Sequence, residues 1–303
     1  MRAFTLDGFD AHPGLRDDIP DPEVADNELL VRVHASSVNG IDVFVAAGAL
    51  KEMVEHVFPV ILGRDFAGVV EQVGSGVSHY RVGDEVFGFV LHANPAVHEG
   101  SWAELIAVPE DLQVAAKPHG VSFTEAGAAP LAGLSAIEAY DALAPAEGKT
   151  VLVVGAAGGV GSLFVQLAAA AGAHVIAPAL PEDDAYLRSF GVSELVDRTG
   201  DVAAAVRNAH PDGVDAILDV VSQGPNTSLL KEGGRLASTL GAAGDGEGRA
   251  NIIAQPTPSK LQLLDAGALR VPIQRTYGFE QAGEALDALP ATHTQGKLAL
   301  RIR

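Results

Sequence analysis

The sequence predicts an α/β protein of two domains, a strand-rich and mostly antiparallel barrel and a doubly wound parallel sheet. In residues 1–120, segments such as 28–35 end in alternating apolar and polar residues, as a half-buried strand does. From about Ser122 onward, helical segments instead alternate with short apolar runs. That alternation is typical of a parallel sheet with helices on both faces.

The order of the predicted elements sets the domain boundaries. Besides 28–35, strands are expected in the first domain at 69–73 and 85–90, each flanked by glycine. The strands of the parallel sheet are expected at 151–154, 174–177, 194–197, 216–219, 235–238 and 251–254. A strand at 271–277, a helix at 279–289 and a strand at 297–302 are expected to rejoin the first domain. The predicted domains are therefore 1–120 with 269–303, and 121–268.

Composition excludes several classes of function. The chain has 303 residues and a formal net charge of −19, which repels phosphate backbones and argues against binding to nucleic acid. It has no cysteine, so disulfides, thiolate nucleophiles and thiolate zinc sites are excluded. No apolar run approaches a membrane span, and residues 1–10 contain acids rather than a signal peptide. A cytoplasmic protein without a membrane partner is expected.

A glycine-rich segment is the most informative part of the chain. The apolar run 151–154 leads into Gly-Ala-Ala-Gly-Gly-Val-Gly at 155–161, and a segment with helical apolar spacing follows. Glycines between a strand and a helix let the backbone approach a pyrophosphate, which the helix N-terminus then binds. The alternative is a tight turn without a ligand. We expect dinucleotide contacts from Gly155, Ala157, Gly158, Gly159 and Val160.

Further segments, in this order along the chain, resemble the zinc-independent quinone oxidoreductase branch of the medium-chain dehydrogenase/reductase superfamily. They lie at 34–42, which contains Asn39-Gly-Ile-Asp42, and at 58–70, 80–86, 128–136, 155–161, 233–236 and 296–300. The resemblance implies a barrel-like (GroES-like) catalytic domain, a Rossmann domain with a cleft between them, an NADP(H) cofactor and a homodimer. It also implies further cofactor contacts, at Val220, Thr239, Leu240 and Gly241.

The residues at the zinc-ligand positions argue against a metal. Zinc-using relatives carry a cysteine near position 37 and a Gly-His-Glu segment, whereas this chain has Gly63-Arg64-Asp65 and no cysteine. The arginine is a cation and cannot bind zinc. The ten histidines are scattered along the sequence, and the closest pair, His92 and His98, is expected to be solvated. No metal site is predicted.

The expected reaction needs little acid catalysis, because no metal polarises the carbonyl. Hydride transfer from the nicotinamide to a quinone or a small enone fits this requirement. By the resemblance, Asn39 and Asp42 border the cleft. Asn39 would hydrogen-bond the substrate carbonyl or the nicotinamide ribose, or else its own backbone in a turn. Asp42 would be catalytic or, as we favour, form an ion pair with Arg64.

The substrate pocket is expected to be apolar. Family members often carry tyrosines shortly after the Asn-x-x-Asp stretch, but this chain has Phe44 and Leu50 there. Leu131 is the third predicted pocket residue. With no side chain standing out as a general acid, water would supply the proton.

The residues that would distinguish NADP(H) from NAD(H) point in opposite directions. Glu182 and Asp183 follow the second strand of the parallel sheet, and acids there oppose a 2′-phosphate and favour a free ribose hydroxyl. Arg198 stands where the family usually has a tyrosine beside the adenosine, and an arginine can bind phosphate bidentately. NADP(H) is expected, with NAD(H) as the alternative.

Two other functions are compatible with the sequence. One is an enoyl-thioester reductase, although the acidic chain opposes docking of an acidic carrier protein. The other is a non-catalytic dinucleotide-binding scaffold or redox sensor, which would share the glycine loop with an enzyme.

Overall fold

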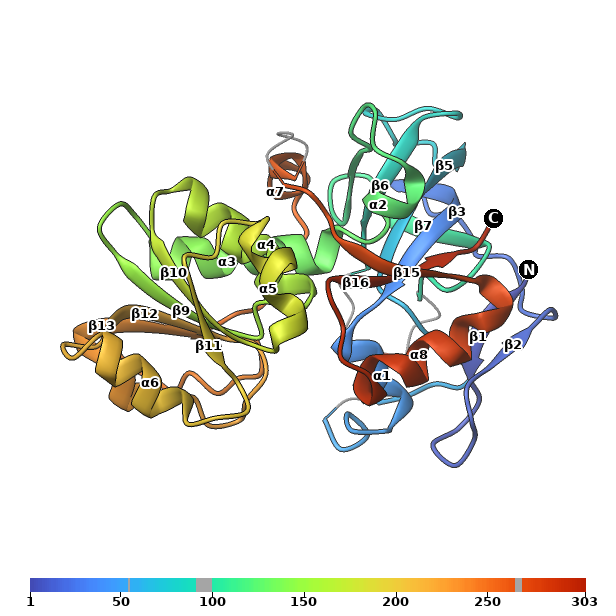
Figure 1. The fold of residues 1–303 in the computed structure, drawn as a ribbon. Coiled ribbons are helices and arrows are strands. Elements are labelled where there is room, and N and C mark those ends of the chain that lie inside the picture. The colour runs from blue at the N-terminus through green and yellow to red at the C-terminus, as the bar shows by residue number, and fades with distance from the viewer. Residues whose placement is uncertain (54, 91–99, 265–268) are drawn as a thin grey trace. The chain divides into compact units, whose positions relative to one another are not determined.

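The computed structural model describes residues 1–53, 55–90, 100–264 and 269–303, which form two compact units (Figure 1). Unit 1 comprises Met1–Leu131 and Gln255–Arg303, and unit 2 comprises Ala132–Ala254. The sequence predicts the divisions between the units at 120 and 269 instead. The observed first division, after Leu131, falls inside helix α3 (Pro130–Leu143). After the observed second division, at Ala254, helix α7 (Pro258–Leu263) packs against β8 (Val114–Ala116) and so belongs to unit 1.

Unit 2 is a six-stranded sheet in the order β11-β10-β9-β12-β13-β14 with every pair parallel. The strands are β9 (Thr150–Val154), β10 (His174–Ala179), β11 (Glu194–Asp197), β12 (Val214–Asp219), β13 (Leu230–Ser238) and β14 (Arg249–Asn251). This is the Rossmann strand order, in which the direction of winding reverses between the first and fourth strands. The predicted doubly wound sheet is therefore present, although its last strand lies at 249–251 rather than at 251–254.

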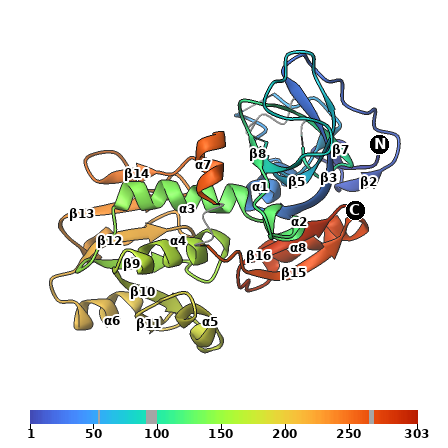
Figure 2. The same cartoon turned by 90° about the horizontal axis from the view of Figure 1, so that it is seen from above.

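Helices cover both faces of this sheet. Figures 1 and 2 show α3 and α4 (Gly159–Ala170) over one face and α6 (Val202–Ala209) on the opposite face. Val206 of α6 packs in a buried cluster with Leu152, Ile176 and Val196 from three neighbouring strands. The remaining elements of the unit are η1 (Pro181–Asp183), α5 (Asp184–Arg188) and η2 (Thr227–Leu229).

Unit 1 is built on a seven-stranded sheet around one long strand, β3 (Glu28–Val38). β3 pairs antiparallel with β5 (Asp65–Val73), β7 (Leu105–Pro109) and β16 (Lys297–Arg301). Two register shifts along its pairing with β5 bend it, as bulges do. The other strands are β6 (Glu85–Phe89), β8 and β15 (Ile273–Gly278), and a separate three-stranded sheet contains β1 (Ala3–Leu6), β2 (Gly14–Arg16) and β4 (Val60–Ile61).

The C-terminal elements, from β15 onward, belong to unit 1, as predicted. β15 and β16 form a parallel pair at the edge of the sheet that contains β3. The predicted helix at 279–289 consists of a 3₁₀ turn, η3 (Phe279–Gln281), followed by α8 (Ala282–Ala291). α8 packs against α1 (Gly40–Ala46), and α2 (Phe123–Ala126) packs against β3. None of the helices in the described ranges has the length and apolar character of a membrane span.

Candidate functional site

The glycine loop of unit 2 turns sharply between β9 and α4. Gly155 has a φ of +90°, and a Cβ added there would lie 2.6 Å from Cγ2 of both Val220 and Val221. A Cβ added to Gly161 would lie 2.1 Å from the carbonyl oxygen of Gly155. Because neither position has room for a side chain, packing of the loop itself explains these two glycines.

Gly158 differs from Gly155 and Gly161 in having room for a side chain. Its φ is −76°, an ordinary value, and a Cβ added there would meet only the carbonyl oxygen of Gly155, at 3.6 Å. Gly158 is also the N-cap of α4, so it lies beside the first amide groups of the helix, which lack carbonyl partners within the helix. Packing does not require a glycine here, whereas an anionic ligand at the helix N-terminus would.

The loops after β12 and β13 reach the same edge of the sheet as the glycine loop, because carboxyl ends of parallel strands share an edge. The buried carboxylate of Asp219 accepts the backbone N–H of Val221 at 2.9 Å and the hydroxyl of Ser222 at 2.5 Å. It thereby fixes the turn that contains Val220, a predicted cofactor contact. Sequence reasoning missed Asp219, although an acid at the end of an apolar strand was the available signal.

The hydroxyl of Ser238 shapes the segment that contains Thr239, Leu240 and Gly241. It accepts the backbone N–H of Leu240 at 3.1 Å and that of Ala242 at 3.3 Å, and Gly241 has a φ of +72°. The structure therefore brings all the predicted glycine-loop and strand-end contacts to one edge of unit 2.

The acids after β10 are not equivalent. Asp183 is 1% exposed, and its carboxylate accepts the backbone N–H of Leu180 at 3.0 Å, whereas Glu182 is exposed. Of the two, Glu182 is thus the better placed to reach a ribose. Tyr186, which sequence reasoning missed, donates its hydroxyl to the carbonyl oxygen of Ala157 at 3.2 Å and so holds α5 to the glycine loop.

Arg198 follows β11 directly, and its side chain is exposed at the same edge of the sheet. Its backbone N–H donates to the carbonyl oxygen of Ala179 at the end of β10, at 3.0 Å. This bond fixes the backbone of Arg198 beside the segment that contains Glu182.

The polar site in unit 1 is a buried network around the carboxylate of Asp65. Its Oδ2 accepts the hydroxyl of Ser37 at 2.5 Å and the side-chain amide of Asn39 at 2.9 Å. Its Oδ1 accepts the backbone N–H of Leu131 at 2.8 Å. Nζ of Lys297 lies 3.5 Å from Oδ2, so an ion pair is enclosed in the network.

Lys297 links this network to the end of β3. Its side chain is buried, and Nζ donates to the carbonyl oxygen of Val38 at 3.2 Å and to Oδ1 of Asn39 at 2.5 Å. Burial lowers the pKa of the Lys297 ammonium, while the carboxylates of Asp65 and Asp42 act in the opposite direction. Asn39 thus uses both ends of its side-chain amide on protein partners, Asp65 and Lys297.

Asp42 lies on the first turn of α1, and its carboxylate accepts the backbone N–H of Asn39 at 2.8 Å. Burial raises the pKa of Asp42 to about 7, although the charges of Arg64 and Lys297 act to lower it. The expected partner Arg64 therefore acts on Asp42 electrostatically, but its charge does not compensate fully for burial.

This raised pKa predicts an unusual dependence of stability on pH. The folded protein keeps a proton on Asp42 between pH 4 and 7, where the unfolded chain, with a pKa of 3.8, releases it. This contribution therefore stabilises the fold at low pH and is lost as the pH rises to 7. Asn at position 42 resembles the protonated acid and does not ionise. The free energy of unfolding of Asp42→Asn, measured relative to that of the wild type, should therefore be higher at pH 8 than at pH 4, by on the order of 2–4 kcal/mol. Urea denaturation of both proteins at several pH values measures this difference, and two parallel pH profiles would contradict it.

The three predicted pocket residues differ in their contacts and burial. The backbone of Leu131 touches the Asp65 network, and Leu50 is partly buried against the apolar core. Phe44 lies on α1, but its side chain is 44% exposed. His92 and His98, the closest pair of histidines in the sequence, lie outside the described residues.

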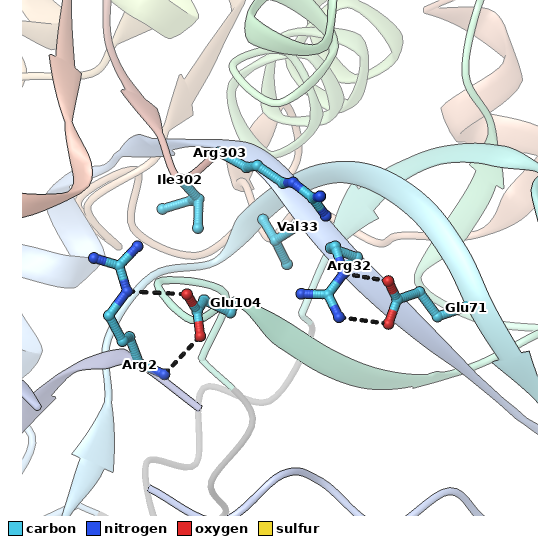
Figure 3. A pocket seen from close by; sticks show the side chains of 7 residues that line it. All are labelled: Arg2, Arg32, Val33, Glu71, Glu104, Ile302 and Arg303. Carbon is cyan, nitrogen blue, oxygen red and sulfur yellow. Dashed lines mark hydrogen bonds and ion pairs between the residues drawn. The ribbon is translucent and has the colours of Figure 1, made fainter. Parts of the chain in front are cut away.

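A pocket elsewhere in unit 1 contains none of the predicted site residues (Figure 3). Its lining residues are Arg2, Arg32, Val33, Glu71, Glu104, Ile302 and Arg303. Glu104 pairs with Arg2 at 2.9 Å, and Glu71 pairs with Arg32. Both of its carboxylates are therefore paired with arginines, and it does not resemble the apolar pocket expected for the substrate.

Together, the strand-rich unit 1 and the Rossmann sheet of unit 2 with its glycine loop define a two-domain, dinucleotide-binding class of protein. Comparison with protein families agrees: residues 25–119 match the alcohol dehydrogenase GroES-like domain, and residues 159–258 match the zinc-binding dehydrogenase family. The second family is named for zinc, yet this chain has no cysteine.

Individual relatives identify the branch of the family to which the chain belongs. The chain is 30% identical over 295 residues to the NADPH-dependent alkenal/one oxidoreductase of Arabidopsis thaliana, covering 94% of this chain and 75% of the relative. It is 35% identical to the 2-methylene-furan-3-one reductase of Solanum lycopersicum, covering 75% of this chain but only 58% of that protein. The quinone oxidoreductase structure from Coxiella burnetii superposes with a TM-score of 0.87 and 30% identity, covering 100% of this chain and 99% of the other. The chain belongs to the quinone oxidoreductase branch of the medium-chain dehydrogenase/reductase superfamily.

Proposed function

We propose that this chain transfers a hydride from NADPH to a quinone or a small enone without using zinc. The observation that carries the proposal is the open position at Gly158, at the N-terminus of α4 and at the reversal point of a Rossmann sheet. The names of the relatives, which include alkenal/one and methylene-furanone reductases and quinone oxidoreductases, support a conjugated carbonyl as the acceptor.

The residues of unit 2 would bind and orient the dinucleotide. Gly158 leaves room for the pyrophosphate, and the N-terminal amides of α4 would donate to it. The turns fixed by Asp219 and Ser238 would border the same ligand. When bound, the nicotinamide supplies the hydride, and the protein contributes position and exclusion of water.

The network in unit 1 would act by positioning rather than by proton transfer. Asn39 is held by Asp65 and Lys297, and the second N–H of its amide would donate to a substrate or ribose oxygen. The amide cannot lose or gain a proton at neutral pH, so it is suited to orienting a carbonyl. We infer that water delivers the proton that completes reduction of the acceptor.

The decay of NADPH absorbance with a panel of quinones and enones tests this proposal. We expect turnover with at least one acceptor, and rates that a strong chelator leaves unchanged, because the chain has no cysteine and has Arg64 at the expected ligand position. Loss of activity in the chelator would refute zinc independence. Turnover of acyl-thioester enones alone would indicate an enoyl-thioester reductase, and tight dinucleotide binding without turnover would indicate a scaffold or redox sensor.

Arg198 is proposed to bind the 2′-phosphate of NADPH. Arg198→Ala should weaken NADPH binding about ten- to a hundredfold, which corresponds to roughly 1.5–3 kcal/mol for one charge-assisted bond, and should leave NADH binding nearly unchanged. Calorimetric titration with both dinucleotides measures the two affinities. Arg207→Ala, an exposed arginine on α6, is the matched control. A wild type that prefers NADH would contradict the proposal and implicate Glu182 in ribose recognition.

A further inference from the structure

A second cluster of polar side chains lies at the opposite edge of the Rossmann sheet from the glycine loop. His174 is the first residue of β10, Glu194 is the first residue of β11, and His210 caps the C-terminus of α6. The two histidines are 36 positions apart in the sequence, so their spacing gave no signal. The amino ends of the strands form this edge, whereas the predicted dinucleotide contacts lie at the carboxyl ends.

The topology of unit 2 brings these three side chains together. Ile176 is paired with Glu194 across the parallel strands, and residues two apart on a strand point to the same face, so His174 and Glu194 share a face. Helix α6 covers that face, because its Val206 packs in the same cluster as Ile176. Helix α6 leaves the carboxyl end of β11 and returns to the amino edge of the sheet, where its C-terminal His210 lies within 2.9 Å of Glu194.

The atoms of the cluster converge as metal ligands do. Nε2 of His174 lies 3.3 Å from Oε2 of Glu194, and Nε2 of His210 lies 2.9 Å from the same oxygen. The ligand atoms of all three residues lie within 4.8 Å of one another. Bond lengths of about 2.0–2.2 Å in a tetrahedral site put neighbouring ligand atoms about 3.3–3.5 Å apart. Small side-chain rotations would therefore suffice to form such a site.

The chemistry of the three groups selects a class of ion. Two imidazoles and one carboxylate suit divalent first-row transition ions rather than calcium or magnesium, which prefer sets of oxygen ligands. The C-terminal end of α6 carries the negative end of the helix dipole, which also favours a cation. The side chains are 44%, 29% and 20% exposed for His174, Glu194 and His210, so an ion has access and keeps positions for water.

We propose that His174, Glu194 and His210 form a reversible binding site for a divalent transition ion such as Zn²⁺ or Co²⁺. The ion would join β10, β11 and the end of α6. The site stands apart from the proposed hydride transfer, because none of its residues lies at the carboxyl edge of the sheet. Binding of the ion should therefore leave the reductase activity unchanged, as should its removal by a chelator.

Titration of the untagged full-length chain with ZnCl₂, by calorimetry in a buffer that does not bind metal, tests the proposal. We expect one equivalent of Zn²⁺ to bind and to raise the unfolding temperature. Co²⁺ should give the visible absorption of a site with nitrogen and oxygen ligands. His174→Ala and His210→Ala should each weaken binding by about tenfold or more, since even loss of a group that only supports a ligand has an effect of that size.

Two further variants keep the result interpretable. Glu194→Gln retains the shape of the side chain but removes the anionic ligand, and it should also weaken binding. His119→Ala removes an exposed histidine from unit 1 and should leave binding unchanged. Unaltered NADPH binding in each variant would show that unit 2 is folded. Absence of saturable binding, or equal affinity in the wild type and in His174→Ala, would mean that the cluster is an ion pair only and would overturn the proposal.

Discussion

Gly158→Val is expected to abolish detectable dinucleotide binding while the protein keeps its fold. The backbone at Gly158 has an ordinary φ of −76°, and an added Cβ meets only the Gly155 carbonyl oxygen, at normal contact distance. The valine methyl groups would instead project into the space that a pyrophosphate needs beside the amides of α4. We expect the dissociation constant for NADPH to rise by about a hundredfold or more, equivalent to roughly 3 kcal/mol. Calorimetric titration measures the change.

A second glycine of the same loop provides the matched control. Gly161→Ala introduces a Cβ that would lie 2.1 Å from the carbonyl oxygen of Gly155, so this variant should lose stability rather than binding alone. Its thermal unfolding temperature should fall, whereas that of Gly158→Val should stay within a few degrees of the wild type. Unchanged NADPH affinity in Gly158→Val would show that the loop is not the dinucleotide site.

Lys297→Met is expected to destabilise unit 1 strongly. The substitution removes the ammonium from the buried network and leaves the carboxylate of Asp65, which is 0% exposed, without its cationic partner. Breaking a buried ion pair by removing one partner destabilises proteins by about 3–5 kcal/mol. For a chain of this size the unfolding temperature should fall on the order of 10 °C. Differential scanning calorimetry measures the shift.

The double variant Asp65→Asn/Lys297→Met separates loss of the pair from loss of packing. Removing both charges takes away the uncompensated carboxylate, so the double variant should be more stable than Lys297→Met. Asp65→Asn completes the double-mutant cycle. If the effects of the two single substitutions simply add, the two side chains are not coupled and the described ion pair contributes nothing specific.

Much of the fold could be predicted from local patterns. The strand predicted at 194–197 coincides with β11, and those predicted at 151–154 and 297–302 each differ from the observed strands by a single residue at one end. The error at 251–254 has a local cause. Gly248, with a φ of +71°, ends a turn directly before Arg249, so the strand begins earlier than its apolar residues indicate.

Less of the candidate site than of the fold could be predicted from the sequence. The glycine loop could be found because strand, glycines and helix are consecutive. The contacts of Asn39 could not be predicted, because its partner Lys297 lies 258 residues away and is brought to it only by the pairing of β16 with β3. The cluster of His174, Glu194 and His210 was missed for the same reason, since it depends on strand order and on the position of α6. Contacts of this kind require the topology and not the local pattern.

The pairing of β3 with β16 also constrains the order in which the chain folds during synthesis. Leu300 pairs with Ser36, so the sheet of unit 1 cannot be completed until the last strand has left the ribosome. Unit 2 is continuous over Ala132–Ala254 and can form its own core while that strand is still missing. We therefore expect nascent chains released after unit 2 to contain a protease-resistant Rossmann core and an exposed, incomplete barrel. Unpaired edges of β3 would then make these chains prone to capture by chaperones or to aggregation.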